Sequence, residues 1–167
     1  SQRLAFKLGA LYLLAMRPDR AEAVFRRVIQ LEQDPAGEAY ALLQLAVALD
    51  RQPTKRAEAL STLGQLKAEK YATTFWGPYG QFRLALFTYN QRQNPRESMP
   101  LYKAMFTRFP DHPMAYSALL CYVLDAEAAG DLKEMRTAAQ AFLAKYGSSP
   151  HAPHVRKRLV AVTKRKD

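Results

Sequence analysis

Breaks in helical periodicity recur along the whole chain and constrain its fold more than any other feature. Proline, glycine and cap-forming residues leave segments of about 12 to 20 residues between them, the ordinary length of a globular helix. From Ala21 to Ile29 the apolar residues follow the i, i+3, i+4, i+7 spacing of one helix face, and no sustained period-two alternation indicates a strand. The pattern predicts helices at residues 2–16, 19–33, 36–50, 55–70, 74–92, 95–109, 113–129, 131–146 and 151–164.

The first two segments form a unit that later segments repeat. Leu8-Gly9, Tyr12, Ala21 and Phe25 stand at the spacing typical of tetratricopeptide (TPR) units, whose period is about 34 residues. The chain therefore resembles the TPR family. A single helix pair cannot bury its apolar face alone, so such pairs stack on their neighbours.

Of three further units, the third fits the TPR pattern without a gap from Phe82 to Pro110, and the second and fourth match it less completely. An irregular helical bundle with chance matches is the alternative. The resemblance implies an all-α, right-handed TPR-like solenoid of about four helix-turn-helix units with a C-terminal capping helix. Small residues such as Gly9 and Gly64 are expected to let helices approach closely. The predicted boundaries are 1–150 for the repeat domain, about 2–35, 37–70, 79–112 and 113–148 for its units, and 151–167 for a basic capping helix and tail.

The first helices of successive TPR pairs line a concave groove, so the resemblance places a partner-binding surface there. Carried over position by position, this groove is mostly apolar, which suits a docked amphipathic helix or extended peptide. Phe6 stands where TPR co-chaperones that clamp a terminal carboxylate use a polar side chain, so that activity is not implied. The alternative is that Leu13, Leu45 and Leu49 pack against one another. The predicted groove residues are Phe6, Leu13, Leu14, Leu45, Leu49, Arg83, Phe87, Asn90 and Cys121.

The joint between the second and third units is rich in aromatic residues. Residues 71–80 read YATTFWGPYG, and Trp76 is the only tryptophan of the chain. Trp76 either packs at this joint or is an exposed aromatic side chain that contacts a partner, since exposed tryptophan is frequent among the residues that dominate binding energy.

Positive charge is concentrated at the end of the chain. The formal net charge is +10, and residues 151–167 carry six cations against one acid. Such a patch can bind nucleic acid, an anionic membrane surface or an acidic protein, whereas the alternative is a solvated terminal helix. No aromatic residue lies among these charges, so base stacking is not supported. The patch consists of Arg156, Lys157, Arg158, Lys164, Arg165 and Lys166.

Catalytic signals are missing from the sequence. It has no glycine-rich phosphate loop, no G-x-S-x-G and no H-E-x-x-H. His151 and His154 have no further metal-ligating residue nearby, and a metal site needs more than two ligands. We therefore expect no enzymatic activity, no metal and no cofactor. The lone Cys121 lies in an apolar run and is expected to be an inert thiol.

The function predicted from these features is a non-enzymatic scaffold that binds a helix or peptide of another protein. The run from Gly130 to Val162 resembles bacterial envelope TPR proteins, with Met135 and Gly147 where alanine and proline are typical. This favours a bacterial periplasmic or envelope-associated assembly or export complex over the cytoplasm. The alternatives are anionic polymer or membrane binding through the basic patch, and a TPR domain cut from a larger exporter or enzyme. No stretch of the sequence is long and apolar enough for a transmembrane helix.

Overall fold

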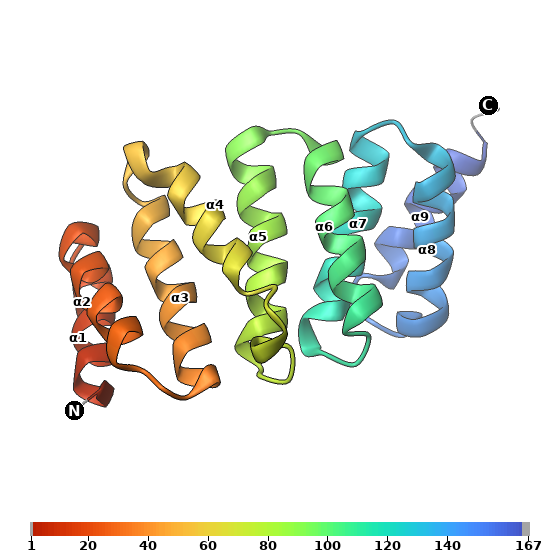
Figure 1. The fold of residues 1–167 in the computed structure, drawn as a ribbon. Helices are drawn as coiled ribbons and strands as arrows, with labels where there is room; N and C mark the ends of the chain where they lie inside the picture. Colours follow the sequence, from red (N-terminus) through yellow and green to blue (C-terminus); the bar gives the residue numbers. More distant parts are fainter. Residues whose placement is uncertain (1, 165–167) are drawn as a thin grey trace. The chain divides into compact units, whose positions relative to one another are not determined.

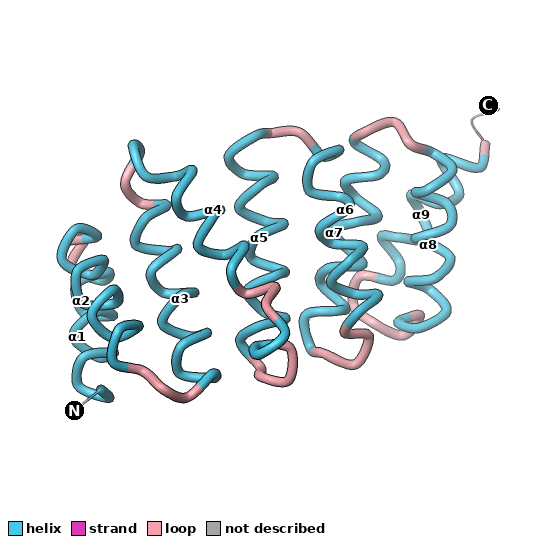
Figure 2. The backbone as a smooth tube through the Cα atoms, in the orientation of Figure 1, coloured by secondary structure: helices cyan, strands magenta, loops and turns pink. Residues whose placement is uncertain are grey.

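The computed structural model describes residues 2–164, which form helices joined by loops (Figures 1 and 2). The chain divides into two compact units, Ser1–Phe87 (unit 1) and Thr88–Asp167 (unit 2). The all-α fold predicted from the sequence is confirmed.

Unit 1 is built from consecutive helices that pack on one another in chain order. α1 packs on α2, α2 on α3 and α3 on α4. α5 begins in unit 1 and continues into unit 2. The elements are α1 (Gln2–Leu14), α2 (Pro18–Leu31), α3 (Pro35–Asp50), the 3-10 turn η1 (Pro53–Lys55), α4 (Arg56–Gln65), the 3-10 turn η2 (Glu69–Tyr71) and α5 (Trp76–Arg92).

Unit 2 follows the same rule. α6 packs on α7, α7 on α8 and α8 on α9. Its helix boundaries follow capping chemistry: the side chains of Asn94 and Asp131 accept hydrogen bonds from the first-turn amides of α6 and α8. The elements are α6 (Pro95–Arg108), α7 (Pro113–Ala128), α8 (Leu132–Tyr146) and α9 (Ala152–Thr163).

The fourth helix is shorter than predicted. The pattern predicts a helix over 55–70, but α4 ends at Gln65 and the 3-10 turn η2 follows at Glu69–Tyr71. Leu66 and Tyr71 are both buried in the core of unit 1. Residues five apart in a continuous α-helix point about 140° away from each other, so the change of helix type lets both side chains face the core.

The two glycines that we expected to permit close packing behave differently. A Cβ at Gly9 would lie 2.5 Å from the ring of Phe25, so this glycine does allow α1 and α2 to approach. A Cβ at Gly64 would meet nothing within 4 Å. The prediction is therefore confirmed for Gly9 and wrong for Gly64.

Candidate functional site

Five aromatic side chains of unit 1 form a connected series, called here the aromatic row. The Phe6 and Tyr40 rings lie 5.2 Å apart between centroids, and those of Tyr40 and Trp76 lie 4.7 Å apart. Trp76 also contacts Phe75 at 4.9 Å and Tyr79 at 5.9 Å. These distances are typical of favourable tilted and edge-to-face ring pairs.

The row joins the N-terminal halves of three helices. In unit 1, α1, α3 and α5 run in the same direction, so their N-terminal ends lie at one edge (Figure 1). Phe6 comes from α1, Tyr40 from α3, and Trp76 and Tyr79 from the start of α5. Four of the rings are half-buried, and Phe75 keeps 48% of its surface exposed. The row therefore presents a partly exposed aromatic surface rather than a closed core.

Two glycines bring the start of α5 to this position. A Cβ at Gly77 would lie 2.2 Å from the carbonyl oxygen of Tyr71, and one at Gly80 would lie 2.1 Å from Leu66 Cδ1. Real Cβ atoms do not approach that closely, so α5 packs directly on the segment that follows α4. The Thr74 hydroxyl accepts a hydrogen bond from the Gly77 amide at 3.0 Å and fixes the helix start. These contacts place Trp76 beside Tyr40.

Arg83 extends the aromatic surface along α5. Its guanidinium lies over the Phe87 ring, 4.9 Å from the centroid, and Nη1 donates to the Tyr79 hydroxyl at 3.4 Å. Tyr79, Arg83 and Phe87 are spaced four residues apart, so they share one face of the helix. Arg83 is half-buried, whereas Phe87 is buried. The stacked arginine gives this end of the surface a positive charge.

Some of the predicted groove residues are buried and others are exposed. Leu13, Leu45, Leu49 and Phe87 are buried in unit 1, which favours the alternative that the three leucines pack the core. Leu14 is 80% exposed.

The remaining predicted positions lie on the aromatic surface or in unit 2. Phe6, Arg83 and Trp76 are half-buried and belong to the aromatic surface. Asn90 is exposed in unit 2, and Cys121 is half-buried there, where burial raises the pKa of its thiol.

Tyr40, Phe75 and Tyr79 belong to the row although the groove positions of the family did not include them. The sequence did contain a signal for two of them, because Phe75 and Tyr79 flank Trp76 in the aromatic joint. Tyr40 carried no such signal, since its contacts depend on the distance between α1, α3 and α5.

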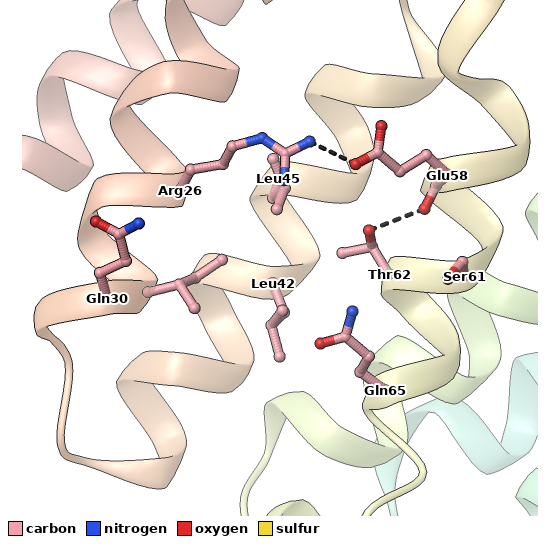
Figure 3. Close-up of a pocket in the computed structure, with 9 residues that line it drawn as sticks. Arg26, Gln30, Leu42, Leu45, Glu58, Ser61, Thr62 and Gln65 are labelled. Atoms are coloured by element: carbon pink, nitrogen blue, oxygen red, sulfur yellow. Dashed lines mark hydrogen bonds and ion pairs between the residues drawn. The ribbon is translucent and has the colours of Figure 1, made fainter.

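A cleft in unit 1 lies where α2 and α4 face each other across α3 (Figure 3). Its volume is about 330 Å³, and Leu42 and Leu45 of α3 line it. The guanidinium of Arg26 and the carboxylate of Glu58 form an ion pair of 2.5 Å across it. The remaining lining side chains are Ile29, Gln30, Ser61, Thr62 and Gln65, so the walls are largely uncharged.

A buried carboxylate holds one end of this cleft region together. Glu22 accepts hydrogen bonds from Lys55 Nζ and Gln52 Nε2, both at 2.7 Å, and from Arg26 Nε at 3.0 Å. Burial on its own raises the pKa of Glu22, but these three hydrogen bonds outweigh it and leave the pKa lowered. The ionised carboxylate therefore ties α2 to the segment after α3.

Unit 2 contains a buried acid, Asp125, whose pKa is shifted in the opposite direction to that of Glu22. Asp125 accepts a hydrogen bond from the Ser98 hydroxyl, which links α7 to α6. Burial raises the pKa of Asp125, and the hydrogen bond from Ser98 offsets only part of that effect. Tyr102 and Cys121 lie in the same region, and burial raises the pKa of both.

The basic patch takes part in packing α9. Arg158 pairs with Glu127 of α7 and donates to His154 Nε2 at 2.7 Å, while Arg156 donates to the Gly147 carbonyl at 2.6 Å. Lys157 and Lys164 are exposed. The other two predicted members of the patch, Arg165 and Lys166, lie outside the described residues.

The two C-terminal histidines have protein partners. His151 Nδ1 contacts the Tyr116 hydroxyl, and His154 accepts from Arg158. Within residues 2–164 no cluster of three or more His, Cys, Asp or Glu side chains is arranged to hold a metal ion. None of the helices in that range is sufficiently long and apolar to span a bilayer.

Comparison with known proteins bears on the fold. The sequence matches no protein-family model and no curated protein. Among solved structures, the chain is similar to MamA RS-1 ArsTM double mutant, a TPR-like protein, with a TM-score of 0.67. The identity is 17%, and the match covers 99% of this chain and 85% of that chain. At this identity the likeness shows a TPR-like helical repeat fold.

Proposed function

We propose that this chain is a non-enzymatic interaction scaffold and that unit 1 binds a helix or extended segment of a partner protein along the aromatic row. The observation that carries the proposal is the row itself, with five contacting rings of which none is fully buried. Half-exposed aromatic side chains offer large apolar area with few rotatable bonds and dominate the energy of many interfaces.

The chemistry of the row defines the partner segment. Apolar side chains of the segment pack against the rings of Phe6, Tyr40 and Trp76. The positive charge of Arg83 favours an acidic or carbonyl group of the partner at the α5 end of the surface. Leu45 and Leu49 are buried, so the proposed surface does not include them.

The test replaces two rings of the row and a matched ring elsewhere. Phe75→Ala combined with Trp76→Ala removes the centre of the row, and Phe109→Ala removes a half-buried ring of unit 2. Proteins captured from the source cells by the wild-type chain are quantified against both variants, and the affinity of each captured partner is measured by calorimetry. We expect the double variant to weaken binding about tenfold or more and the control to bind like the wild type.

Partners that bind the double variant and the wild type equally would contradict the proposal. Thermal unfolding of each variant separates lost binding from lost folding. Charged replacements at Leu45 or Phe87 are unsuitable, because both side chains are buried and their replacement would unfold unit 1.

The setting that we propose is a bacterial envelope assembly or export complex. It rests on the resemblance of residues 130–162 to envelope TPR proteins. Fractionation of the source cells with an antibody against this chain tests it, and recovery of the protein with the cytoplasm alone would contradict it.

The basic patch supports a second candidate, binding of an anionic polymer or membrane surface, less strongly. Arg156 and Arg158 bind groups of the chain itself, which leaves Lys157 and Lys164 exposed among the described members of the patch. Binding of this kind weakens steeply with salt. Titration with single-stranded DNA at two salt concentrations tests it, and a salt-independent affinity would exclude it. The third candidate, a domain of a larger exporter or enzyme, is tested by the sequence of the full-length gene.

A further inference from the structure

The outer side of α1 carries an exposed leucine stripe. Leu4, Leu8 and Leu11 are 64%, 43% and 60% exposed and follow the i, i+4, i+7 spacing of one helix face. The opposite side of α1 contains Phe6, Gly9 and Leu13, which face the rest of unit 1. A helix that is apolar on both sides is typical of a buried helix. The stripe therefore has the composition of a packing surface.

α2 widens this stripe. Glu22 and Arg26 of α2 reach toward Lys55 and Glu58, so that side of α2 faces α3 and α4. By helical geometry, Val24 and Leu31 lie on the other side of α2, away from those contacts. Leu31 is 52% exposed and Val24 is half-buried. The resulting surface, called here the end face, consists of Leu4, Leu8, Leu11, Val24 and Leu31.

Cations border the end face along both helices. Arg3 and Lys7 lie beside the leucine stripe on α1, and on α2 Arg20 and Arg27 lie one turn before Val24 and Leu31. All four side chains are exposed. Asp19 is within ion-pair distance of Arg17 and Arg20, and the half-buried Glu32 follows Leu31. The apolar surface is thus flanked by an excess of positive charge.

This charge argues against a second copy of the chain as the occupant. Two end faces placed together would bring Arg3, Lys7, Arg20 and Arg27 of both copies into one interface, and like charges at an interface are costly. Stacking the end face on α9 of another copy would oppose the same cations to Lys157 and other basic residues of that helix. A partner with acidic flanks meets neither obstacle.

We propose that the end face docks an amphipathic helix of another protein whose apolar stripe is flanked by Asp and Glu. The i, i+4, i+7 leucine ridge fits the groove between side-chain rows of a partner helix. Arg3 and Lys7 would pair with acids on one side of that helix, and Arg20 and Arg27 with acids on the other. The surface is separate from the aromatic row, so this site goes beyond the function proposed above.

An anionic membrane is the other surface that attracts a basic, apolar helix. The end face favours a protein helix because its five apolar side chains are all aliphatic. Membrane-adsorbing helices commonly add tryptophan or phenylalanine to this face.

The test uses two designed helical peptides of about 20 residues, which span about 30 Å. Both carry the same leucine stripe, one with glutamate and the other with lysine at the flanking positions. Binding to the full chain is measured by fluorescence anisotropy, with sedimentation of the chain alone and flotation with phosphatidylserine vesicles in parallel. The variants are Leu8→Gln with Leu11→Gln, Arg20→Glu with Arg27→Glu, and the control Val160→Gln, which changes an exposed apolar residue of α9.

We expect the glutamate peptide to bind at least about tenfold more tightly than the lysine peptide. The leucine variant should lose about tenfold or more, because two apolar contacts are removed, and Val160→Gln should have no effect. The arginine variant should bind the lysine peptide better than the wild type does. Unfolding midpoints confirm that these exposed substitutions leave the fold intact.

Three results would each overturn the proposal. One is equal or absent binding of the two peptides to the wild-type chain. Another is a dimer of the chain that Leu8→Gln with Leu11→Gln dissociates, which would identify a second copy as the occupant. The third is vesicle binding that the leucine variant abolishes without any peptide binding, which would identify a membrane.

Discussion

The aromatic clusters of the two units have similar ring contacts but differ in the burial of their rings. In unit 2, Tyr116 lies 5.4 Å from Phe142 and 5.0 Å from Tyr146 between centroids, distances close to those of the aromatic row in unit 1. Phe142 of α8 is fully buried, and Tyr116 of α7 also contacts His151 before α9. Tyr116 and Tyr146 are half-buried, as are four rings of the row, but no ring of the row is fully buried and Phe75 is exposed. The two clusters therefore differ in their most buried and most exposed rings, Phe142 and Phe75, and not in ring geometry.

The largest expected contrast between the clusters is in stability. Phe142→Ala should destabilise the chain by about 3 to 5 kcal/mol, because it leaves a cavity where a fully buried ring was. Phe75→Ala should cost less than about 1 kcal/mol, because nearly half of that ring is already exposed. Urea unfolding followed by circular dichroism measures both. Equal losses in the two variants would mean that the row is also a packing cluster.

A second contrast lies in how the row is positioned. Gly77→Ala should destabilise unit 1 by about 1 to 3 kcal/mol, because the added Cβ overlaps the Tyr71 carbonyl and displaces the start of α5. The emission of Trp76, the only tryptophan, reports the displacement directly.

Gly64→Ala is the matched control for Gly77→Ala. It adds the same methyl group inside α4, where nothing lies within 4 Å, and should stabilise the chain by about 0.5 to 1 kcal/mol. A Trp76 spectrum unchanged by Gly77→Ala would show that the glycine does not place the row.

Acidity should affect the two units in opposite directions. The lowered pKa of Glu22 means that its stabilisation is present above the ordinary value of 4.5 and is lost as pH falls toward the folded pKa. The raised pKa of Asp125 means that the folded unit binds that proton more tightly, so its unfavourable effect appears as pH rises through the folded pKa. Hydrogen exchange at pH 7 and pH 4, resolved to each unit, measures the difference.

The variant Asp125→Asn isolates this effect in unit 2. It should raise protection of α6 and α7 more at pH 7 than at pH 4, because it removes a carboxyl group whose burial opposes ionisation. Glu22→Gln should lower protection of unit 1 at pH 7 instead. The same response to both substitutions would contradict the assigned pKa directions.

The smallest expected effect is at the α2–α4 cleft. The Arg26–Glu58 pair is largely solvated, with both side chains more than 40% exposed, so Glu58→Gln should cost at most about 1 kcal/mol. Glu22→Gln replaces a buried carboxylate that accepts three hydrogen bonds by a neutral amide and should cost more. Denaturation at low and high salt measures both, and only the Glu58 effect should disappear in salt.

Several elements of the fold were predictable from local pattern. Helix starts at residues such as Asn94 and Asp131 follow from caps, and the Gly9–Phe25 contact follows from the spacing of the repeat unit. The end of α4 was not predictable, because it depends on burying both Leu66 and Tyr71 in the same core. Gly64 is also a glycine, but unlike Gly9 it has no neighbouring side chain that a Cβ would meet.

The candidate sites show the same division. The sequence singled out Trp76 and Arg83, and the structure brings both to one surface with Phe6. The sequence pattern also placed Leu45 and Leu49 among the groove positions, although both are buried. Helical periodicity identifies which residues share a face but not which neighbour covers that face.

Sequence by itself therefore determined the helical repeat and the identity of its apolar faces, because helix formation and capping act over a few neighbouring residues. Only the tertiary structure decided which of these faces are covered. Leu45 and Leu11 both belong to apolar helix faces. Leu45 is buried beside residues of α2 and α4, whereas Leu11 remains exposed on α1. Exposure depends on which distant segments of the chain pack together. Arg26 and Glu58, for example, are in contact although they lie 32 residues apart in the sequence, and no local pattern predicts such a contact.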